Sequence, residues 1–168
     1  MIMWKANPIH NKILNQLFSD FERNKKHQIL DAGSGRTSLK FLSQYFSGSK
    51  ITAIIYPGDE RKKSGINESV KAKNFNLKEV DLHKFKQEAK FDIVLAHLLL
   101  GEATKFSKQP FVKMVDSLFK IKTDYLAVID ILEDVSVDYR LLLKFFAKKG
   151  QIQKIICEDK YIGFLLCK

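Results

Sequence analysis

Apolar side chains recur along this chain with two different spacings, and each spacing predicts a different kind of element. Between residues 7 and 21, isoleucine, leucine and phenylalanine return every three or four positions, as on one face of an amphipathic helix. An asparagine followed by a proline stands at the start of this segment, a pair that commonly caps a helix and opens its first turn. The same spacing predicts further helices at 38–46, 108–121 and 136–150. The polar stretch 61–72 has only weak helical periodicity.

Short runs rich in β-branched and other apolar residues separate these helices and predict strands. Five such runs lie at 27–32, 50–56, 75–82, 91–100 and 123–132. Because they alternate with helices, we expect a parallel sheet with right-handed crossovers.

Two further apolar runs, 151–157 and 161–167, lie at the end of the sequence, and only three residues separate them. A linker this short cannot hold a crossover helix, so these two strands must pair as an antiparallel hairpin. The sequence therefore predicts an α/β fold with a doubly wound, mostly parallel sheet that ends in a hairpin.

The length of 168 residues and the hydrophobic content of 45% are typical of one domain with a sizeable core. We interpret 1–27 as a short N-terminal helical segment and 28–168 as a Rossmann-like core. No apolar run approaches the ~18 residues that a membrane span needs. No apolar signal core precedes Asn7-Pro8 either, so we expect a cytoplasmic protein without a membrane partner.

The net charge of +10 indicates which class of partner the protein could bind. A basic protein with pI near 9.5 favours nucleic acid or another polyanion electrostatically. The lysines are spread singly and in short pairs, however, as they also are when they simply solvate helix faces. The two cysteines, Cys157 and Cys167, have no CxxC spacing, and we expect them to be buried free thiols.

Candidate chemistry is concentrated in the segment QILDAGSGRTSLKFL, which spans 28–42. Gly33 and Gly35 lack a Cβ, so the backbone there can adopt positive φ and a ligand can approach it closely. The helix that follows would direct its free N–H groups toward the same turn, as in a nucleotide-binding cradle. A dinucleotide-binding fingerprint would require a third glycine at the position of Ser38, which disfavours a nicotinamide-dependent oxidoreductase.

The pattern Asp-x-Gly-x-Gly in ILDAGSGRT, together with the terminal hairpin, resembles the class I S-adenosylmethionine-dependent methyltransferase family. The resemblance extends from about Ile29 to Lys168 and implies a seven-stranded sheet with S-adenosylmethionine as cofactor. Because the cofactor carries a sulfonium and an amino group, the carboxylate of Asp31 would be favourable near its methionine part. Gly33 and Gly35 would let the backbone pass under the ribose and methionine. Asp31 could instead serve only as a cap of the turn.

The resemblance implies further cofactor contacts at the ends of the second and third strands. The family commonly has a ribose-binding acid at the position where this chain has Ile55 or Tyr56, which is a departure. Asp59 could reach back only if the PGD turn curls over the pocket, and Tyr56 could stack on adenine or be a plain surface tyrosine. Asp81 is the candidate for the adenine amino group, with Leu82 lining the base, although a loop aspartate is the alternative. The predicted cofactor-binding residues are Asp31, Ala32, Gly33, Gly35, Thr37, Tyr56, Asp59, Asp81, Leu82 and Ala96.

The segment FDIVLAHLLLGEA resembles the family's fourth strand, with Ala96 and His97 at its end, facing the transferred methyl group. Methyl transfer is an in-line displacement in which a base can take the proton of the nucleophile. His97 is the first catalytic candidate because an unperturbed histidine has a pKa near ~6.5, and Glu102 is the second. A histidine here could equally be a packing or hydrogen-bonding residue. The tetrad AHLL differs from the Asn-Pro-Pro-aromatic tetrad of enzymes that methylate exocyclic base amines.

Two classes of function remain open at this point. The first is a methyltransferase that acts on RNA, a ribosomal particle or a small molecule, with the N-terminal helix and 57–65 as a lid. The second is a non-catalytic module that keeps the fold and binds or regulates, as the missing ribose acid would allow. No metal is expected, because the acids Asp130, Glu133 and Asp134 are spaced too loosely to specify a site.

Overall fold

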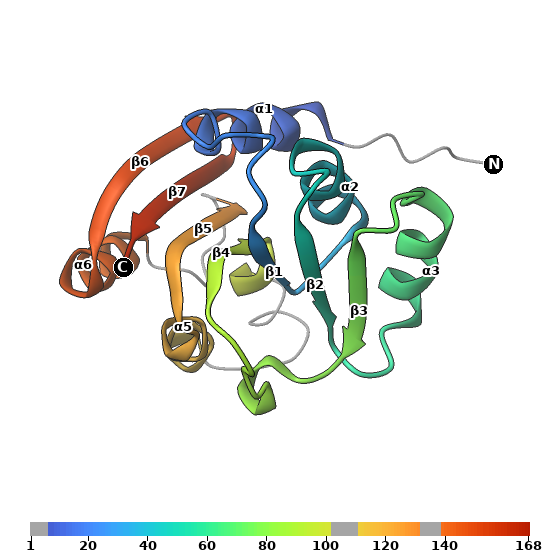
Figure 1. The fold of residues 1–168 in the computed structure, drawn as a ribbon. Coiled ribbons are helices and arrows are strands. Elements are labelled where there is room, and N and C mark those ends of the chain that lie inside the picture. Colours follow the sequence, from blue (N-terminus) through green and yellow to red (C-terminus); the bar gives the residue numbers. More distant parts are fainter. Residues whose placement is uncertain (1–6, 102–110, 132–138) are drawn as a thin grey trace.

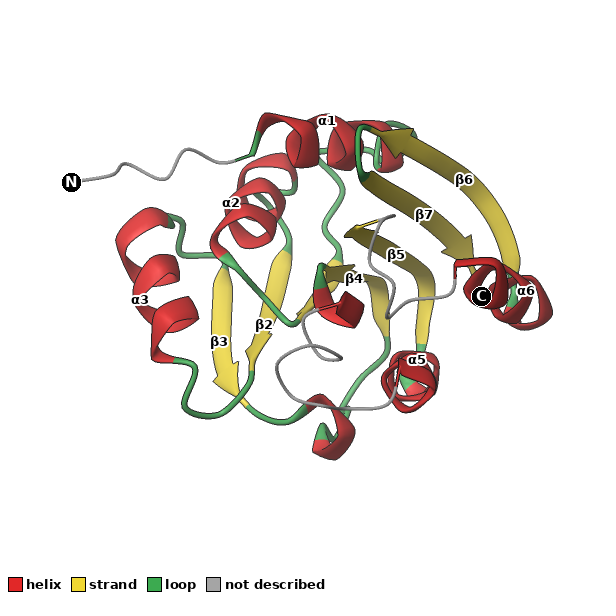
Figure 2. Ribbon diagram, turned by 180° about the vertical axis from the view of Figure 1, so that it is seen from behind, coloured by secondary structure: helices red, strands yellow, loops and turns green. Residues whose placement is uncertain are grey.

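The computed structural model describes residues 7–101, 111–131 and 139–168, which form a seven-stranded mixed sheet between two layers of helices (Figure 1). The strands are β1 (Gln28–Ala32), β2 (Lys50–Ile55), β3 (Phe75–Glu79), β4 (Phe91–His97), β5 (Thr123–Ile131), β6 (Gln151–Glu158) and β7 (Tyr161–Cys167). The helices are α1 (Pro8–Leu17), α2 (Arg36–Tyr45), α3 (Glu60–Ser69), α5 (Phe111–Lys120) and α6 (Tyr139–Lys149), with the short 3₁₀ helix η1 (Leu82–Lys84) after β3 (Figure 2).

The strand order is β3-β2-β1-β4-β5-β7-β6. β1 pairs in parallel with β2 and β4, and β2–β3 and β4–β5 are parallel as well. β7 lies between β5 and β6 and is antiparallel to both. The predicted doubly wound sheet with a C-terminal antiparallel hairpin is therefore confirmed. The chain winds outward from β1 in both directions, so the boundary between β1 and β4 is the topological switch point.

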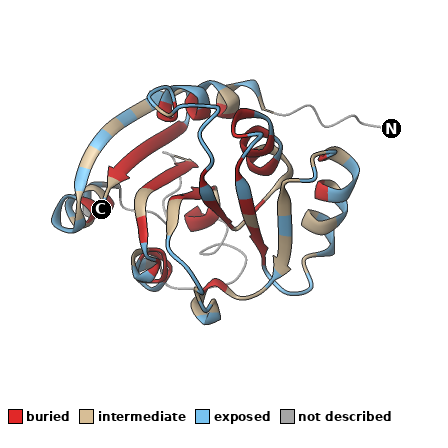
Figure 3. Cartoon of the chain, viewed as in Figure 1, coloured by how far each residue is buried: buried red, intermediate tan, exposed pale blue. Residues whose placement is uncertain are grey.

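Side chains of the central strands alternate between two cores, one on each face of the sheet. Ile29 and Ile93 belong to the core that α1, α2 and α3 cover, with Leu14, Leu17, Leu39, Leu42 and Ile66 from the helices. Leu30 and Val94 belong to the core on the face of α5 and α6, with Val115, Leu118, Leu142 and Phe146. Figure 3 shows the resulting band of buried residues through the sheet. Because strand side chains have a period of two, this alternation decides which strand-end residues can share a site.

The N-terminal helix packs directly on the C-terminal hairpin. A Cβ added to Gly163 in β7 would lie 2.6 Å from Cγ2 of Ile13, so glycine is what permits this close approach. Nζ of Lys154 in β6 donates to the backbone oxygen of Gln16 at 3.0 Å and pairs with Asp20. The two ends of the described chain are thus joined across one face of the sheet. No helix among the described residues is long and apolar enough to cross a membrane.

The expectation of buried cysteines was wrong. Cys157 is exposed and Cys167 is half-buried, and both thiols are free. The reason is strand order: β6 is the edge strand, and its odd-numbered side chains point to solvent, those of Ile155 and Cys157 among them. The apolar pattern of this segment does not reveal that it lies at the edge.

Candidate functional site

A cavity of about 480 Å³ opens at the switch point, beside the carboxyl ends of β1 and β4. Open α/β sheets bind ligands at this position, because the crossover helices diverge there and leave a crevice. The glycine turn after β1, the first turn of α2, one side of α3 and the end of β4 contribute its walls. The lining residues are Gly33, Gly35, Arg36, Thr37, Arg61, Lys62, Ser64, Gly65, Glu68, His97 and Leu98.

The two glycines of the turn have different roles. Gly33 has φ +70°, and a Cβ there would lie 2.5 Å from Cδ1 of Leu99, so both backbone and packing require glycine. Gly35 is the N-cap of α2, and its φ of −141° is an extended conformation that any residue can adopt. A Cβ added there would meet nothing within 4 Å. The missing side chain at Gly35 therefore keeps space open over the N-terminus of α2.

Asp31 holds the turn together from below. Its Oδ2 accepts hydrogen bonds from the hydroxyls of Ser34, at 2.5 Å, and Ser38, at 2.8 Å. The side chain is fully buried, and among the described residues its Oδ1 has no hydrogen-bond partner. Burial raises the pKa of Asp31 to about 6, although both hydroxyls and the charge of Lys62 oppose that shift. The contact of Asp31 with the cofactor stays a prediction.

Basic side chains line the cavity beside the turn. Arg36 begins α2, Arg61 and Lys62 lie in the first turn of α3, and Glu68 is the acid among the lining residues. Nζ of Lys62 lies 3.5 Å from the backbone oxygen of Gly33. Arg61 and Lys62 were not among the predicted cofactor-binding residues, although the Asp59-Glu60 pair before them is a helix-start signal that would have placed them in a first turn.

His97 ends β4 and faces the α1–α3 side of the sheet, where it is 7% exposed. Its Nε2 lies 3.0 Å from Nδ1 of His10 in α1, and the two rings meet edge to face. Burial is the main cause that lowers the pKa of His97 to about 3, with His10 and Lys62 adding to it. Burial, and then the charge of Lys160, lowers the pKa of His10 to about 4. Both imidazoles are therefore neutral at pH 7.

His10 was not among the predicted site residues, but the sequence holds a signal for it. It precedes Ile13, Leu14 and Leu17 by three, four and seven positions, so it lies on the apolar stripe of its helix. A polar residue on such a stripe is buried and needs a partner. What the sequence does not reveal is that this partner is His97, 87 positions away.

Several predicted cofactor residues lie away from this cavity. Ala32 and Ala96 are paired in register and buried on the α5–α6 face, contrary to the expectation that Ala96 faces the methyl group. The alternation of β4 is the reason, because His97 takes the opposite face. Asp59 accepts from the backbone N–H of Lys62 at 3.1 Å and so caps α3 instead of reaching toward a ribose.

The carboxyl end of β3 lies beside that of β2, on the same edge of the sheet as the cavity. The backbone N–H of Val80 donates to the oxygen of Ile55, which holds the ends of β2 and β3 together. Asp81 caps η1 by accepting from the N–H of His83, Leu82 is buried, and Tyr56 is 55% exposed. None of Tyr56, Asp81 and Leu82 lines the cavity. Glu102 lies outside the described residues.

Asp130 has a structural role at the end of β5. Its Oδ2 accepts from the backbone N–H groups of Leu100 and Gly101, both at 3.1 Å, and caps the helical turn 99–101. Glu133 and Asp134 lie outside the described residues. Within 7–101, 111–131 and 139–168, no three histidine, cysteine, aspartate or glutamate side chains are grouped so as to hold a metal.

No protein-family model matches the chain, and no curated protein matches its sequence. Solved structures match its fold. The N-methyltransferase NodS from Bradyrhizobium japonicum, in complex with S-adenosyl-L-homocysteine, superimposes with a TM-score of 0.72 at 11% identity, over 98% of this chain and 89% of that one. A SAM-dependent methyltransferase from Aquifex aeolicus gives 0.70 at 16% identity, over 96% and 93%.

An rRNA methylase from Escherichia coli gives a TM-score of 0.65 at 14% identity, over 95% of this chain and 63% of that one. The three matched structures include different kinds of methyltransferase, so their similarity to this chain identifies a fold and no acceptor. The chain has the fold of the class I S-adenosylmethionine-dependent methyltransferases.

Proposed function

We propose that this protein is an S-adenosylmethionine-dependent methyltransferase whose cofactor binds in the cavity at the switch point. The observation that carries the proposal is the open space above Gly35, at the N-terminus of α2, in a sheet with the methyltransferase strand order. A ligand there can approach the backbone N–H groups that the first turn of a helix leaves without intrahelical partners.

The charges around the cavity fit the zwitterionic end of the cofactor. Arg61, Lys62 and the α2 N-terminus would suit its carboxylate, and Glu68 and the buried Asp31 would be the negative groups available to its amino group and sulfonium. Thr37 lines the same wall. On the adenine side we keep Asp81 and Leu82 as contacts of the base, with Tyr56 available to stack on it.

The bound cofactor supplies an electrophilic methyl group, and the protein's part is to align the acceptor with it. A histidine with a pKa of about 3 is a weak base at neutral pH, because it holds a proton far less well than water-exposed imidazole does. We therefore propose that His97 contacts and orients a reactant, and that it does not deprotonate the acceptor. Glu102 stays the second catalytic candidate.

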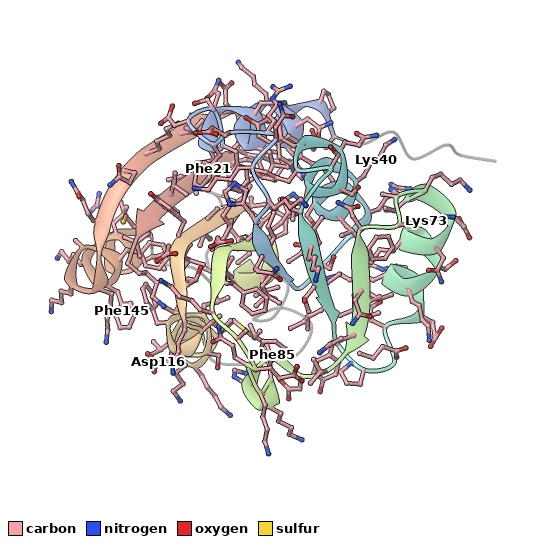
Figure 4. The ribbon with its side chains drawn as sticks, viewed as in Figure 1. Phe21, Lys40, Lys73, Phe85, Asp116 and Phe145 are labelled. Carbon is pink, nitrogen blue, oxygen red and sulfur yellow. The ribbon has the colours of Figure 1, made fainter. Side chains whose placement is uncertain are left out.

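The acceptor that the charges favour is RNA. The protein carries a net charge of +10, the cavity wall is basic, and exposed lysines such as Lys40 and Lys73 point outward on the α2–α3 side (Figure 4). Phosphates bind such surfaces without sequence preference, and the affinity falls steeply with salt. A small-molecule acceptor is the alternative, because a cavity of about 480 Å³ lies within the usual size of small-ligand sites.

A non-catalytic binding module is the second candidate function. Ile55 or Tyr56 stands where the family has its ribose acid, and Asp59, the nearest substitute, is already used as the cap of α3. Such a module would bind the cofactor weakly or without turnover.

Calorimetry with a matched pair of glycine variants tests the cofactor proposal. In Gly35→Val the added side chain enters open space over α2, so the fold is retained and binding of S-adenosylmethionine and S-adenosylhomocysteine should be lost. In Gly48→Val the added Cβ also meets nothing within 4 Å, but the position is away from the cavity, so binding should be unchanged. NAD should not bind to any of the three proteins. Equal loss in both variants, or no binding by folded wild type, would overturn the proposal.

A second experiment tests the acceptor. Transfer of a labelled methyl group to RNA should fall in Arg61→Glu, which reverses a charge at the cavity, and should persist in Lys148→Glu, the same charge change on an exposed lysine of α6. Equal transfer by the two variants would contradict an RNA contact at the cavity. Transfer to small amines or hydroxyl compounds with none to RNA would favour the alternative acceptor.

A further inference from the structure

The side chain of Asn7 connects the start of α1 to the wall of the cavity. Its Oδ1 accepts a hydrogen bond from the backbone N–H of Ile9 at 3.0 Å, which is the N-cap contact of the helix. A backbone N–H can only donate, so the atom that meets it must be the amide oxygen. The N-cap therefore fixes which end of the amide is nitrogen, and Nδ2 points the other way.

Nδ2 of Asn7 lies 3.3 Å from Nε2 of His10 and 3.3 Å from the hydroxyl of Tyr161. An amide nitrogen carries two hydrogens and no lone pair for acceptance, so it donates to both groups. Nε2 of His10 must then be the nitrogen without a proton, because two N–H groups facing each other at this distance would repel. In a neutral imidazole the single proton is left on Nδ1.

The proton on Nδ1 of His10 in turn decides the tautomer of His97. Nδ1 of His10 lies 3.0 Å from Nε2 of His97, and only one proton can lie between them. Since His10 provides it, Nε2 of His97 accepts, and the proton of His97 is on Nδ1. Both rings are 7% exposed or less, and their lowered pKa values keep each to one proton at pH 7.

We propose that Asn7 and His10 are positioning residues that hold His97 as its Nδ1–H tautomer, so that His97 presents a hydrogen-bond donor to the ligand in the cavity. The tautomer follows from the contacts of Asn7, His10 and His97 alone, whereas its meaning for methyl transfer rests on the proposed function. His97 would then donate a hydrogen bond to a carboxylate or carbonyl oxygen of the ligand, or to a lone pair of the nucleophile. It has no free lone pair with which to take a proton from that nucleophile.

The N-terminal helix thereby sets a specificity of the cavity without touching the ligand. A site that donates on its His97 side and is basic at Arg61 and Lys62 selects groups that accept hydrogen bonds and carry negative charge. A protonated amine would find no hydrogen-bond acceptor at His97, so we expect discrimination against methyl acceptors that present a cationic group to His97.

Nitrogen NMR of the ligand-free protein tests the assignment directly. With ¹⁵N-labelled histidine, long-range proton–nitrogen spectra at pH 7 distinguish a protonated ring nitrogen from a bare one, and single histidine-to-glutamine variants assign the four histidines. We expect a protonated Nδ1 and a bare Nε2 in both His10 and His97. A protonated Nε2 in either ring would overturn the proposal, and it would leave the calorimetric test of cofactor binding unaffected.

Two variants test the role of Asn7. Asn7→Ser keeps a good N-cap but removes the amide donor, so the Nε2–H tautomer of His97 should become populated while the helix stays intact. Asn11→Ser makes the same change one turn further along α1 and should leave every histidine spectrum as in wild type. A purely Nδ1–H His97 in folded Asn7→Ser would show that Asn7 does not set the tautomer and would overturn that part of the proposal.

Discussion

Replacing Gly33 by alanine should destabilise the protein for two separable reasons. A non-glycine residue in the left-handed region costs about 1–2 kcal/mol. The new Cβ would also lie 2.5 Å from Cδ1 of Leu99, whose side chain is 9% exposed and has little room to move, and overpacking of this kind costs about 1–3 kcal/mol. We therefore expect Gly33→Ala to lose about 2–5 kcal/mol of unfolding free energy, measured by urea denaturation.

A double-mutant cycle with Leu99→Ala separates the two contributions. Truncating Leu99 removes Cδ1, the atom that would lie 2.5 Å from the new Cβ, and leaves only its own Cβ at 3.3 Å, so the double variant should be about 1–3 kcal/mol more stable than the sum of the single effects predicts. The backbone penalty at Gly33 should remain. Additivity within about 0.5 kcal/mol would refute the reasoning, because it would mean that Leu99 does not pack over the glycine.

Three further outcomes are expected. The unfolding free energy should fall as the pH drops from about 6.5 to about 4, because His10 and His97 gain protons in this range in the unfolded chain but not in the folded protein. The raised pKa of Asp31 has the opposite effect, but it offsets the contribution of only one of the two histidines. Urea titrations over a pH series check this, and His10→Gln, as the control, should show a less steep dependence on pH. Gly163→Ala should cost about 1–3 kcal/mol, since its Cβ would lie 2.6 Å from α1, and an unchanged denaturation midpoint would contradict that packing. Asn7→Asp should raise the pKa of His10, seen in an NMR titration, because a carboxylate would replace the amide beside Nε2; a constant pKa would disprove the contact.

Features of the fold that depend on local sequence were predictable. The Asn7-Pro8 start of α1, the glycine turn after β1 and the short hairpin linker, which is Asp159-Lys160 in the structure, each follow from the conformational limits of the residues present. The seven-stranded sheet with its antiparallel terminal hairpin followed from the family resemblance joined to these local signals, whereas the position of β7 between β5 and β6 was not predicted. The sheet could be placed in this way because alternation and linker length restrict the possible topologies to a few.

The partners of individual polar side chains were not predictable to the same degree. Asp59 has the residue type expected at a ribose contact, but in the structure it caps α3, and the sequence did not reveal that Asp31 accepts from the hydroxyls of Ser34 and Ser38. The contact of His10 with His97 joins residues far apart in sequence, and the exposure of Cys157 depends on which strand forms the edge. These side-chain partners and exposures depend on tertiary packing, which cannot be predicted from helical or strand periodicity.

The central claim is that the cavity between the glycine turn and the end of β4 binds S-adenosylmethionine. The most direct test is to titrate ¹⁵N-labelled protein with S-adenosylhomocysteine and to follow the backbone amide signals. We expect the largest shifts at residues 33–37 and at Leu98, which line or form the cavity. Shifts confined to other parts of the sheet, or a folded protein whose spectrum does not change at high ligand concentration, would contradict it.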